Sequence, residues 1–146
     1  MMVKEKQYAI SVLGLANQIR RVFNCSTNNN GVQTHILYFV LKNYPERDIY
    51  QKDIEEELNV RSASISTLLK KLEEQEMIVR KKVPQDDRLK KICPTSSSMG
   101  MKKKVDEDIH LLETRLTSGI CKEDLKVFFK VVQKMTENMS SEGGFL

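Results

Sequence analysis

The apolar positions of this chain recur mostly at helical spacing. From residue 5 to 23, and again from about 32 to 42, hydrophobic side chains lie three and four residues apart, which is typical of an amphipathic helix. Segments with the same period run from about 101 to 116 and from 122 to about 138. The asparagine-rich stretch 24–31 predicts a loop. We therefore predict a mainly α-helical protein.

Two shorter helices lie between these segments. Residues 51–58 (QKDIEEEL) predict a short helix, and residues 62–76 (SASISTLLKKLEEQE) predict a second one with Ser62 as its N-cap. The three residues from Asn59 to Arg61 form the turn between them. Two helices joined by so short a turn outline a helix-turn-helix.

A basic β-hairpin is predicted directly after these helices. Residues 77–83 and 88–92 have the character of two strands, and residues 84–87 (PQDD) are turn material. Residues 78–92 carry six cations and two acids. A cationic hairpin that follows a helix-turn-helix indicates a wing. Residues 96–100 (SSSMG) predict a cap and linker before the next long helix.

Composition and charge limit the classes of function. The net charge of +4 fits a protein with one cationic face, and no apolar run approaches the length of about 20 residues needed to cross a bilayer. The N-terminus is polar, and the odd number of cysteines forms no disulfide or metal pattern. No catalytic motif is present. We expect a cytoplasmic protein that is not an enzyme and has no metal or cofactor.

The wing and the outward side of the second short helix are the candidate DNA-binding surface. Small hydroxyl side chains near a helix start allow close approach to base edges, and lysines neutralise phosphates. Arg88 can reach a narrow minor groove, with Asp86 holding its guanidinium in a bidentate pair. The predicted helix contacts are Ser62, Ala63, Ser64, Ser66, Thr67, Lys70 and Lys71, and the predicted wing contacts are Arg80, Lys81, Lys82, Asp86, Arg88 and Lys90.

Each of these features also has a purely structural interpretation. The serines can simply cap and solvate a helix, and the lysines can protect an exposed hairpin edge from aggregation. The helix alone does not decide between the two interpretations. The cationic hairpin next to it favours DNA.

The order of elements and their residues resemble the MarR family of winged helix-turn-helix regulators. The most specific pieces are QKDIEEELNVRSASISTLLKKLEEQEMI and PQDDRLKKI. The family's D-x-R wing motif falls on Asp86 to Arg88, which implies a minor-groove role for Arg88 and an orienting role for Asp86. The chain departs from the family pattern in two places. Thr67 stands where arginine is common, and residues 94–100 replace a Leu-Thr-x-x-Gly pattern, which implies that the next helix starts about two residues away from its usual position.

The resemblance implies one domain over residues 1–146 that forms a homodimer. Helices 5–23 and 101–138 would interleave with those of the partner, around a winged helix-turn-helix lobe at about 32–95. The large apolar stripes of the terminal helices agree with this expectation. Two recognition helices about 34 Å apart would then bind a palindromic operator in double-stranded DNA.

The resemblance further implies a transcriptional repressor that a small aromatic effector relieves. The candidate effector pocket comprises Leu13, Asn17, Phe23, His35 and Phe39. One alternative is a redox-sensing regulator that uses Cys25, although no nearby cation clearly lowers the pKa of its thiol. Another is a winged-helix module that binds a protein. Such a module has little reason to keep a cationic wing.

Overall fold

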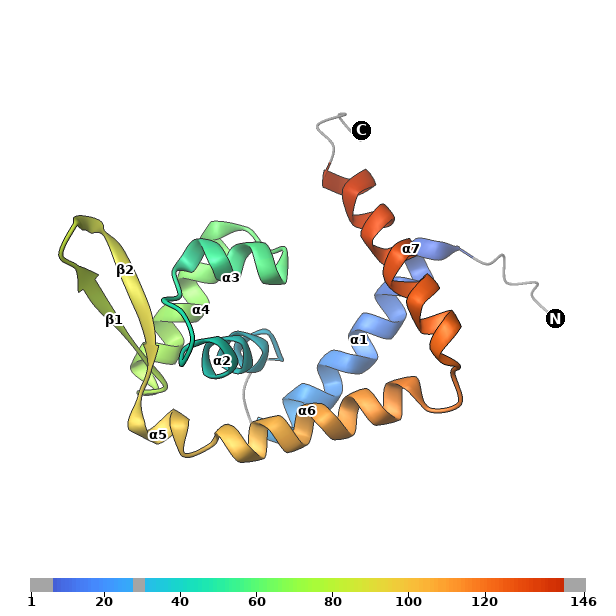
Figure 1. Ribbon diagram of the computed structural model, residues 1–146, viewed down its shortest axis with the longest axis horizontal. Coiled ribbons are helices and arrows are strands. Elements are labelled where there is room, and N and C mark those ends of the chain that lie inside the picture. Colours follow the sequence, from blue (N-terminus) through green and yellow to red (C-terminus); the bar gives the residue numbers. More distant parts are fainter. Residues whose placement is uncertain (1–6, 28–30, 141–146) are drawn as a thin grey trace. The chain divides into compact units, whose positions relative to one another are not determined.

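The structure is a computed structural model that describes residues 7–27 and 31–140, without the side chains of residues 24–27. The chain divides into two compact units, Met1–Asp108 and Ile109–Leu146. The described residues are mainly helical with one two-stranded antiparallel sheet, which confirms the predicted fold class (Figure 1). In chain order the elements are α1 (Tyr8–Thr27), α2 (Gly31–Asn43), α3 (Gln51–Leu58), α4 (Ser62–Glu74), β1 (Ile78–Val83), β2 (Asp86–Pro94), α5 (Ser96–Met99), α6 (Lys102–Thr117) and α7 (Lys122–Ser140).

The predicted helix-turn-helix is formed by α3 and α4. Helix α3 ends at Asn59, which adopts the left-handed conformation (φ 53°) and donates its backbone N–H to the carbonyl of Glu55. Asparagine tolerates this conformation better than most residues, so the chain can turn within three residues. The prediction of Ser62 as N-cap is wrong, because the N-cap is Arg61 and Ser62 is already helical.

A single apolar core joins the helices of the first unit to the wing. Its buried members come from α2, α3, α4, both strands and the segment before α3; α2 and α4 contribute residues at helical spacing, and α3 contributes one residue. The core fixes which sides of α3 and α4 face solvent. Its buried residues are Ile36, Phe39, Val40, Ile49, Ile54, Ile65, Leu69, Leu72, Ile78 and Ile92.

The wing is more irregular than the sequence predicts. Strand β1 pairs with β2 from Ile78 opposite Pro94 to Lys82 opposite Lys90, and the next pair is Val83 with Asp86. Residues 87–89 therefore have no partner in the register and form a bulge. The predicted turn 84–87 is too long, because Asp86 already belongs to β2.

Thr95 ties the end of the wing to the helices on either side. Its hydroxyl donates to the carbonyl of Glu76 (2.7 Å) and accepts from the backbone N–H of Ser98 (3.1 Å). This cap starts the one-turn helix α5, where the sequence predicts a linker. Helix α6 begins only at Lys102, after the break at Gly100.

The remaining helices agree with the sequence except at one end. Helix α1 continues to Thr27, so the loop predicted from residue 24 is wrong for residues 24–27. Each of these residues costs a helix only roughly 0.5 kcal/mol, which an established helix tolerates. Gly119 separates α6 from α7 with φ +78°. In the described part of the chain, no helix has the length and apolar character required to cross a membrane.

Candidate nucleic-acid interface

Helix α4 has one buried side and one polar, exposed side. Ile65, Leu69 and Leu72 are fully buried, so the opposite side of the helix faces solvent. The side chains on that face are short near the start of the helix and long farther along it. Every α4 residue predicted to contact DNA is exposed, namely Ser62, Ala63, Ser64, Ser66, Thr67, Lys70 and Lys71.

The start of α4 offers backbone donors to an anion. Its N-cap, Arg61, is extended, and its side chain makes no capping hydrogen bond. The first turn also contains no acidic residue. Because the first N–H groups of a helix have no partner within it, this end attracts a phosphate.

Gln51, the first residue of α3, connects this helix to the exposed face of α4. Its Nε2 lies 2.8 Å from Ser66 Oγ, 3.3 Å from Ser62 Oγ and 3.3 Å from the Ser62 carbonyl oxygen. The same nitrogen lies 3.2 Å from Glu55 Oε1. Gln51 is thus the side chain that sets the positions of two predicted contact serines.

Thr67 is held differently from the two serines. Its Oγ1 donates to the carbonyl of Ala63 (3.1 Å) one turn earlier in the same helix. The hydroxyl proton is therefore used within the helix, and lone pairs and the methyl group remain for other contacts. Thr67 and Ser66 consequently present different chemistry on neighbouring positions.

Cations face one another across the wing. Lys81 is opposite Lys91, and Lys82 is opposite Lys90. Like charges at directly opposed positions of an antiparallel pair destabilise it. A polyanion lying along the hairpin relieves this repulsion, so the arrangement favours a phosphate backbone as the partner.

Two wing cations are already paired with carboxylates. Arg80 Nε lies 2.8 Å from Glu73 Oε1 on α4, and Lys91 Nζ lies 3.4 Å from Asp48. The hydrogen bond to Asp48 raises the pKa of Lys91. Arg80, a predicted DNA contact, therefore braces the wing against α4. Among the described residues, no ion pair involves the other predicted wing cations, which are Lys81, Lys82, Arg88 and Lys90.

Asp86 orients Arg88 through the backbone. Its Oδ1 accepts the backbone N–H of Arg88 at 2.9 Å, which closes the bulge at the tip of the wing. The expected bidentate pair between the two side chains is not among the ion pairs of the described residues. The guanidinium of Arg88 is therefore left to meet a partner outside the wing.

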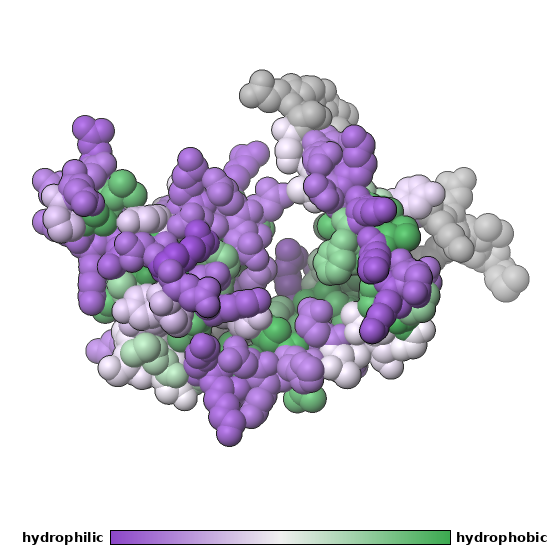
Figure 2. Space-filling model, in the orientation of Figure 1, coloured by the Kyte–Doolittle hydropathy of each residue, from purple (hydrophilic) through white to green (hydrophobic). Residues whose placement is uncertain are grey.

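A groove lies between the wing and the start of α3. Its volume is about 320 Å³. Four cations line it and no carboxylate does, which suits an anionic ligand. In the view of Figure 2, hydrophilic side chains dominate the surface of the wing. The lining residues are Tyr50, Gln51, Lys52, Arg80, Arg88, Leu89, Lys90 and Ile92.

Comparison with known proteins finds a family model that is similar to this lobe. The MarR family model matches residues 29–89, which run from α2 into the wing. Over these residues the chain is similar to the MarR family. No curated protein sequence matches the chain.

Solved structures share the MarR fold over most of the chain. S. aureus MepR in its DNA-binding conformation has 20% sequence identity and a TM-score of 0.82, over 92% of this chain and 100% of that one. The S. aureus MepR–DNA complex has 21% sequence identity and a TM-score of 0.80, over 92% of this chain and 99% of that one. The heme sensor PefR from Streptococcus agalactiae, in complex with heme, has 24% sequence identity and a TM-score of 0.59, over 94% of this chain and 95% of that one. These similarities establish the fold.

A second hollow in this lobe lies at the contact of α1 with α2. Its volume is about 200 Å³. Two residues of the predicted effector pocket, Phe23 and His35, line it. The other three lie elsewhere, since Leu13 and Asn17 are exposed on α1 and Phe39 belongs to the core. The full lining is Ala16, Ile19, Arg20, Phe23, Gly31, Val32, His35, Leu58 and Val60.

Burial lowers the pKa of His35 in this hollow, and the charge of Glu57 opposes the shift only in part. The folded protein therefore binds fewer protons than the unfolded chain below the ordinary pKa of 6.5. We expect the free energy of unfolding to be constant above that pH and to fall as the pH drops below it. The pH dependence of the free energy of unfolding should be weaker in His35→Gln.

Urea denaturation at several pH values between about 5.5 and 7.5 checks this prediction. His110→Gln provides the matched control, because His110 is the other of the two histidines and lies exposed on α6. An equal pH dependence in wild type and His35→Gln would contradict the prediction.

Neither the described cysteines nor a metal-ligand cluster contributes to the candidate interface in the described residues. Cys93 is buried and Cys121 is exposed, and both are free. The side chain of Cys25, the predicted redox candidate, lies outside the described residues. The residues that the structure describes contain no cluster of ligands suited to a metal ion.

Sequence reasoning missed three residues that shape the interface. Gln51 and Lys52 line the wing groove, and Glu73 holds Arg80. Their helical positions were predictable, but their contacts depend on how α3 and the wing cross α4. The sequence carried one signal for these contacts, which is a glutamine at the first position of the short helix, where its amide can reach the next helix.

Proposed function

We propose that this chain is a transcriptional regulator that binds double-stranded DNA through α4 and the wing. One observation carries the proposal: an exposed, hydroxyl-rich helix start lies in the same lobe as a groove lined by four cations and no carboxylate. The helix fits the major groove, and the wing lies along the phosphate backbone. MepR, which shares the fold, is known as a DNA complex.

Substitution of Arg88 tests this proposal. Arg88→Ala should weaken binding to every duplex and reduce the dependence of log affinity on log salt concentration by about one unit, because the protein loses one cation that meets the phosphates and the negative potential of the minor groove. Fluorescence anisotropy with a labelled duplex at several salt concentrations measures both. Arg115→Ala is the matched control, because Arg115 is exposed on α6, and it should leave the slope unchanged. Wild-type affinity of Arg88→Ala across the salt series would refute the wing assignment.

The regulator is proposed to act as a homodimer. Helix α7 has no buried residue in the described structure, and its exposed side chains include Phe128, Phe129 and Val132. The space-filling view shows hydrophobic side chains at the surface of this helix (Figure 2). A monomer in water gains nothing from such a stripe, whereas a second copy buries it.

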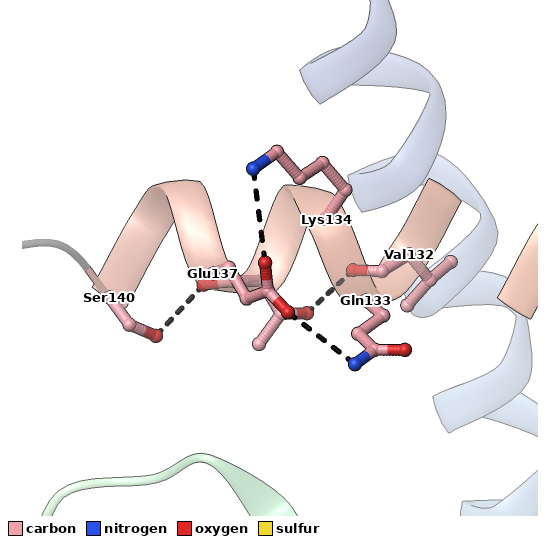
Figure 3. Close-up of polar contacts among 6 residues, drawn as sticks. Val132, Gln133, Lys134, Glu137 and Ser140 are labelled. Carbon is pink, nitrogen blue, oxygen red and sulfur yellow. Dashed lines mark hydrogen bonds and ion pairs between the residues drawn. The ribbon is translucent and has the colours of Figure 1, made fainter. Parts of the chain in front are cut away.

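On the opposite side of α7, polar side chains form hydrogen bonds and an ion pair within the helix (Figure 3). Glu137 meets both Gln133 (3.4 Å) and Lys134 (3.9 Å), and the hydroxyl of Ser140 donates to the carbonyl of Thr136 (2.8 Å). This polar side therefore suits solvent. Two-fold pairing through the apolar side would present two copies of α4 to a palindromic operator.

We further propose repression that a small aromatic molecule relieves. The hollow between α1 and α2 is about 200 Å³ in volume, and a cavity of about 150 Å³ is sufficient for one benzene ring. Apolar walls and two basic groups, Arg20 and His35, suit a small aromatic ligand. Occupation of an operator would block the polymerase sterically, and the ligand would change the spacing of the two α4 helices.

This part of the proposal predicts a ligand-dependent stability. A screen of aromatic compounds should find one that raises the melting temperature and lowers affinity for the operator, because the two binding events are coupled. Phe23→Ala should remove both effects. A screen in which no compound changes either quantity would refute the effector.

A further inference from the structure

The orientation of the Gln51 amide is fixed by its neighbours. The Ser62 carbonyl and the Glu55 carboxylate can only accept hydrogen bonds, and both lie within 3.3 Å of Nε2. The nitrogen end of the amide must therefore face them, and it also faces Ser66 Oγ at 2.8 Å. Because an amide nitrogen only donates, Ser66 Oγ accepts in this contact.

The Ser66 proton is consequently free for another partner. A helical serine or threonine often donates to the carbonyl four residues earlier, as Thr67 does to Ala63. Within the described residues, no hydrogen bond has Ser66 Oγ as its donor. The Ser66 side chain is exposed on the outward side of α4, so its O–H is available to an acceptor outside the protein.

We propose that Gln51 is a specificity-determining positioning residue, which holds Ser66 as a hydrogen-bond donor toward the base edge it meets. The inference rests on the proposed DNA-binding function. In the major groove guanine offers two acceptors and thymine offers one, whereas cytosine offers only a donor. The operator position read by Ser66 is therefore guanine or thymine in preference to cytosine.

Selection of bound duplexes from a random pool tests the inference. Ser66→Ala identifies the operator position that Ser66 contacts, because this variant should lose its preference among the four bases at that position alone. In Gln51→Glu the new carboxylate has no proton for Glu55 or the Ser62 carbonyl, so it should turn away from both and accept the Ser66 proton, which turns the lone pairs of Ser66 outward. The ratio of affinities for cytosine and guanine at that position should then rise about tenfold, which is the scale of one hydrogen bond made or lost.

Two further variants separate specificity from stability. Gln51→Met removes the donor without adding charge and should reduce the discrimination to about twofold or less. The control is Gln133→Glu on α7, where the same i,i+4 amide–carboxylate contact with Glu137 occurs at 3.4 Å. It should leave the base preference unchanged. Thermal melting confirms that each variant is folded.

The outcomes distinguish this inference from the function on which it rests. If wild type selects an operator and the Gln51 variants keep its base ranking, even with uniformly lower affinity, the inference is overturned. That result would mean that Gln51 only braces the helices or that Ser66 donates to a phosphate. If wild type enriches no sequence at all, the proposed function fails, and the inference fails with it.

Discussion

Replacing Phe128 and Val132 of α7 with aspartate should convert the proposed dimer to a monomer. The two side chains lie four residues apart on the same side of the helix and are 50% and 39% exposed in the single chain. Burying a carboxylate without a partner costs several kcal/mol, so the dissociation constant of the dimer should rise at least about 100-fold. Sedimentation velocity over a range of concentrations measures this change.

The same double variant should also lose most of its affinity for a palindromic duplex. A dimer binds the second half-site intramolecularly, and losing this linkage costs about 10²- to 10⁴-fold in affinity. Lys126→Asp with Lys130→Asp is the matched control, because it places the same residues at the same spacing on the polar side of α7. If both double variants dissociated to the same extent, or if neither dissociated, α7 would not be the dimer interface.

The helix-turn-helix could be predicted almost to the residue because its signals are local. The apolar spacing of α4 and the left-handed Asn59 both act within a few positions of the chain. The ends of elements were less predictable. Ser62 has a side chain suited to capping, but the extended residue before the helix is Arg61, so the preference of one residue type did not determine the boundary.

The wing illustrates which interactions remain beyond sequence patterns. Its cationic character was predictable from composition, yet the division of its cations into paired and unpaired groups was not. Arg80 meets Glu73 because Glu76 adopts a positive φ of 58° and the chain folds back along α4. The role of Asp86 likewise depends on the bulge, which brings its carboxylate to the backbone N–H of Arg88.

The candidate effector pocket was the least predictable part of the site. Phe39 and Phe23 both follow helical periodicity, but Phe39 lies in the core while Phe23 lines the hollow. The difference depends on the angle at which α1 crosses α2, which no local pattern encodes. Gly31 lines the same hollow, and the absence of a side chain there contributes space.

Truncating one core residue of α4 should have the largest effect on stability. Leu69 is fully buried in the core that joins α4 to α2, α3 and the wing. Leu69→Ala should reduce the free energy of unfolding by about 2–5 kcal/mol, since it loses buried apolar area and leaves a cavity. This is a large fraction of the 5–15 kcal/mol, roughly, that stabilises a domain of this size.

Urea denaturation followed by far-UV circular dichroism measures this loss, at one fixed protein concentration because the proposed dimerisation would contribute to stability. Leu89→Ala is the matched control, since Leu89 lies on the wing and is 42% exposed. It should change the free energy of unfolding by no more than about 0.5 kcal/mol. A loss below about 1 kcal/mol for Leu69→Ala would mean that α4 is not anchored by this core. Since the exposed face of α4 is defined by its buried face, the proposed DNA surface would then lose its physical basis as well.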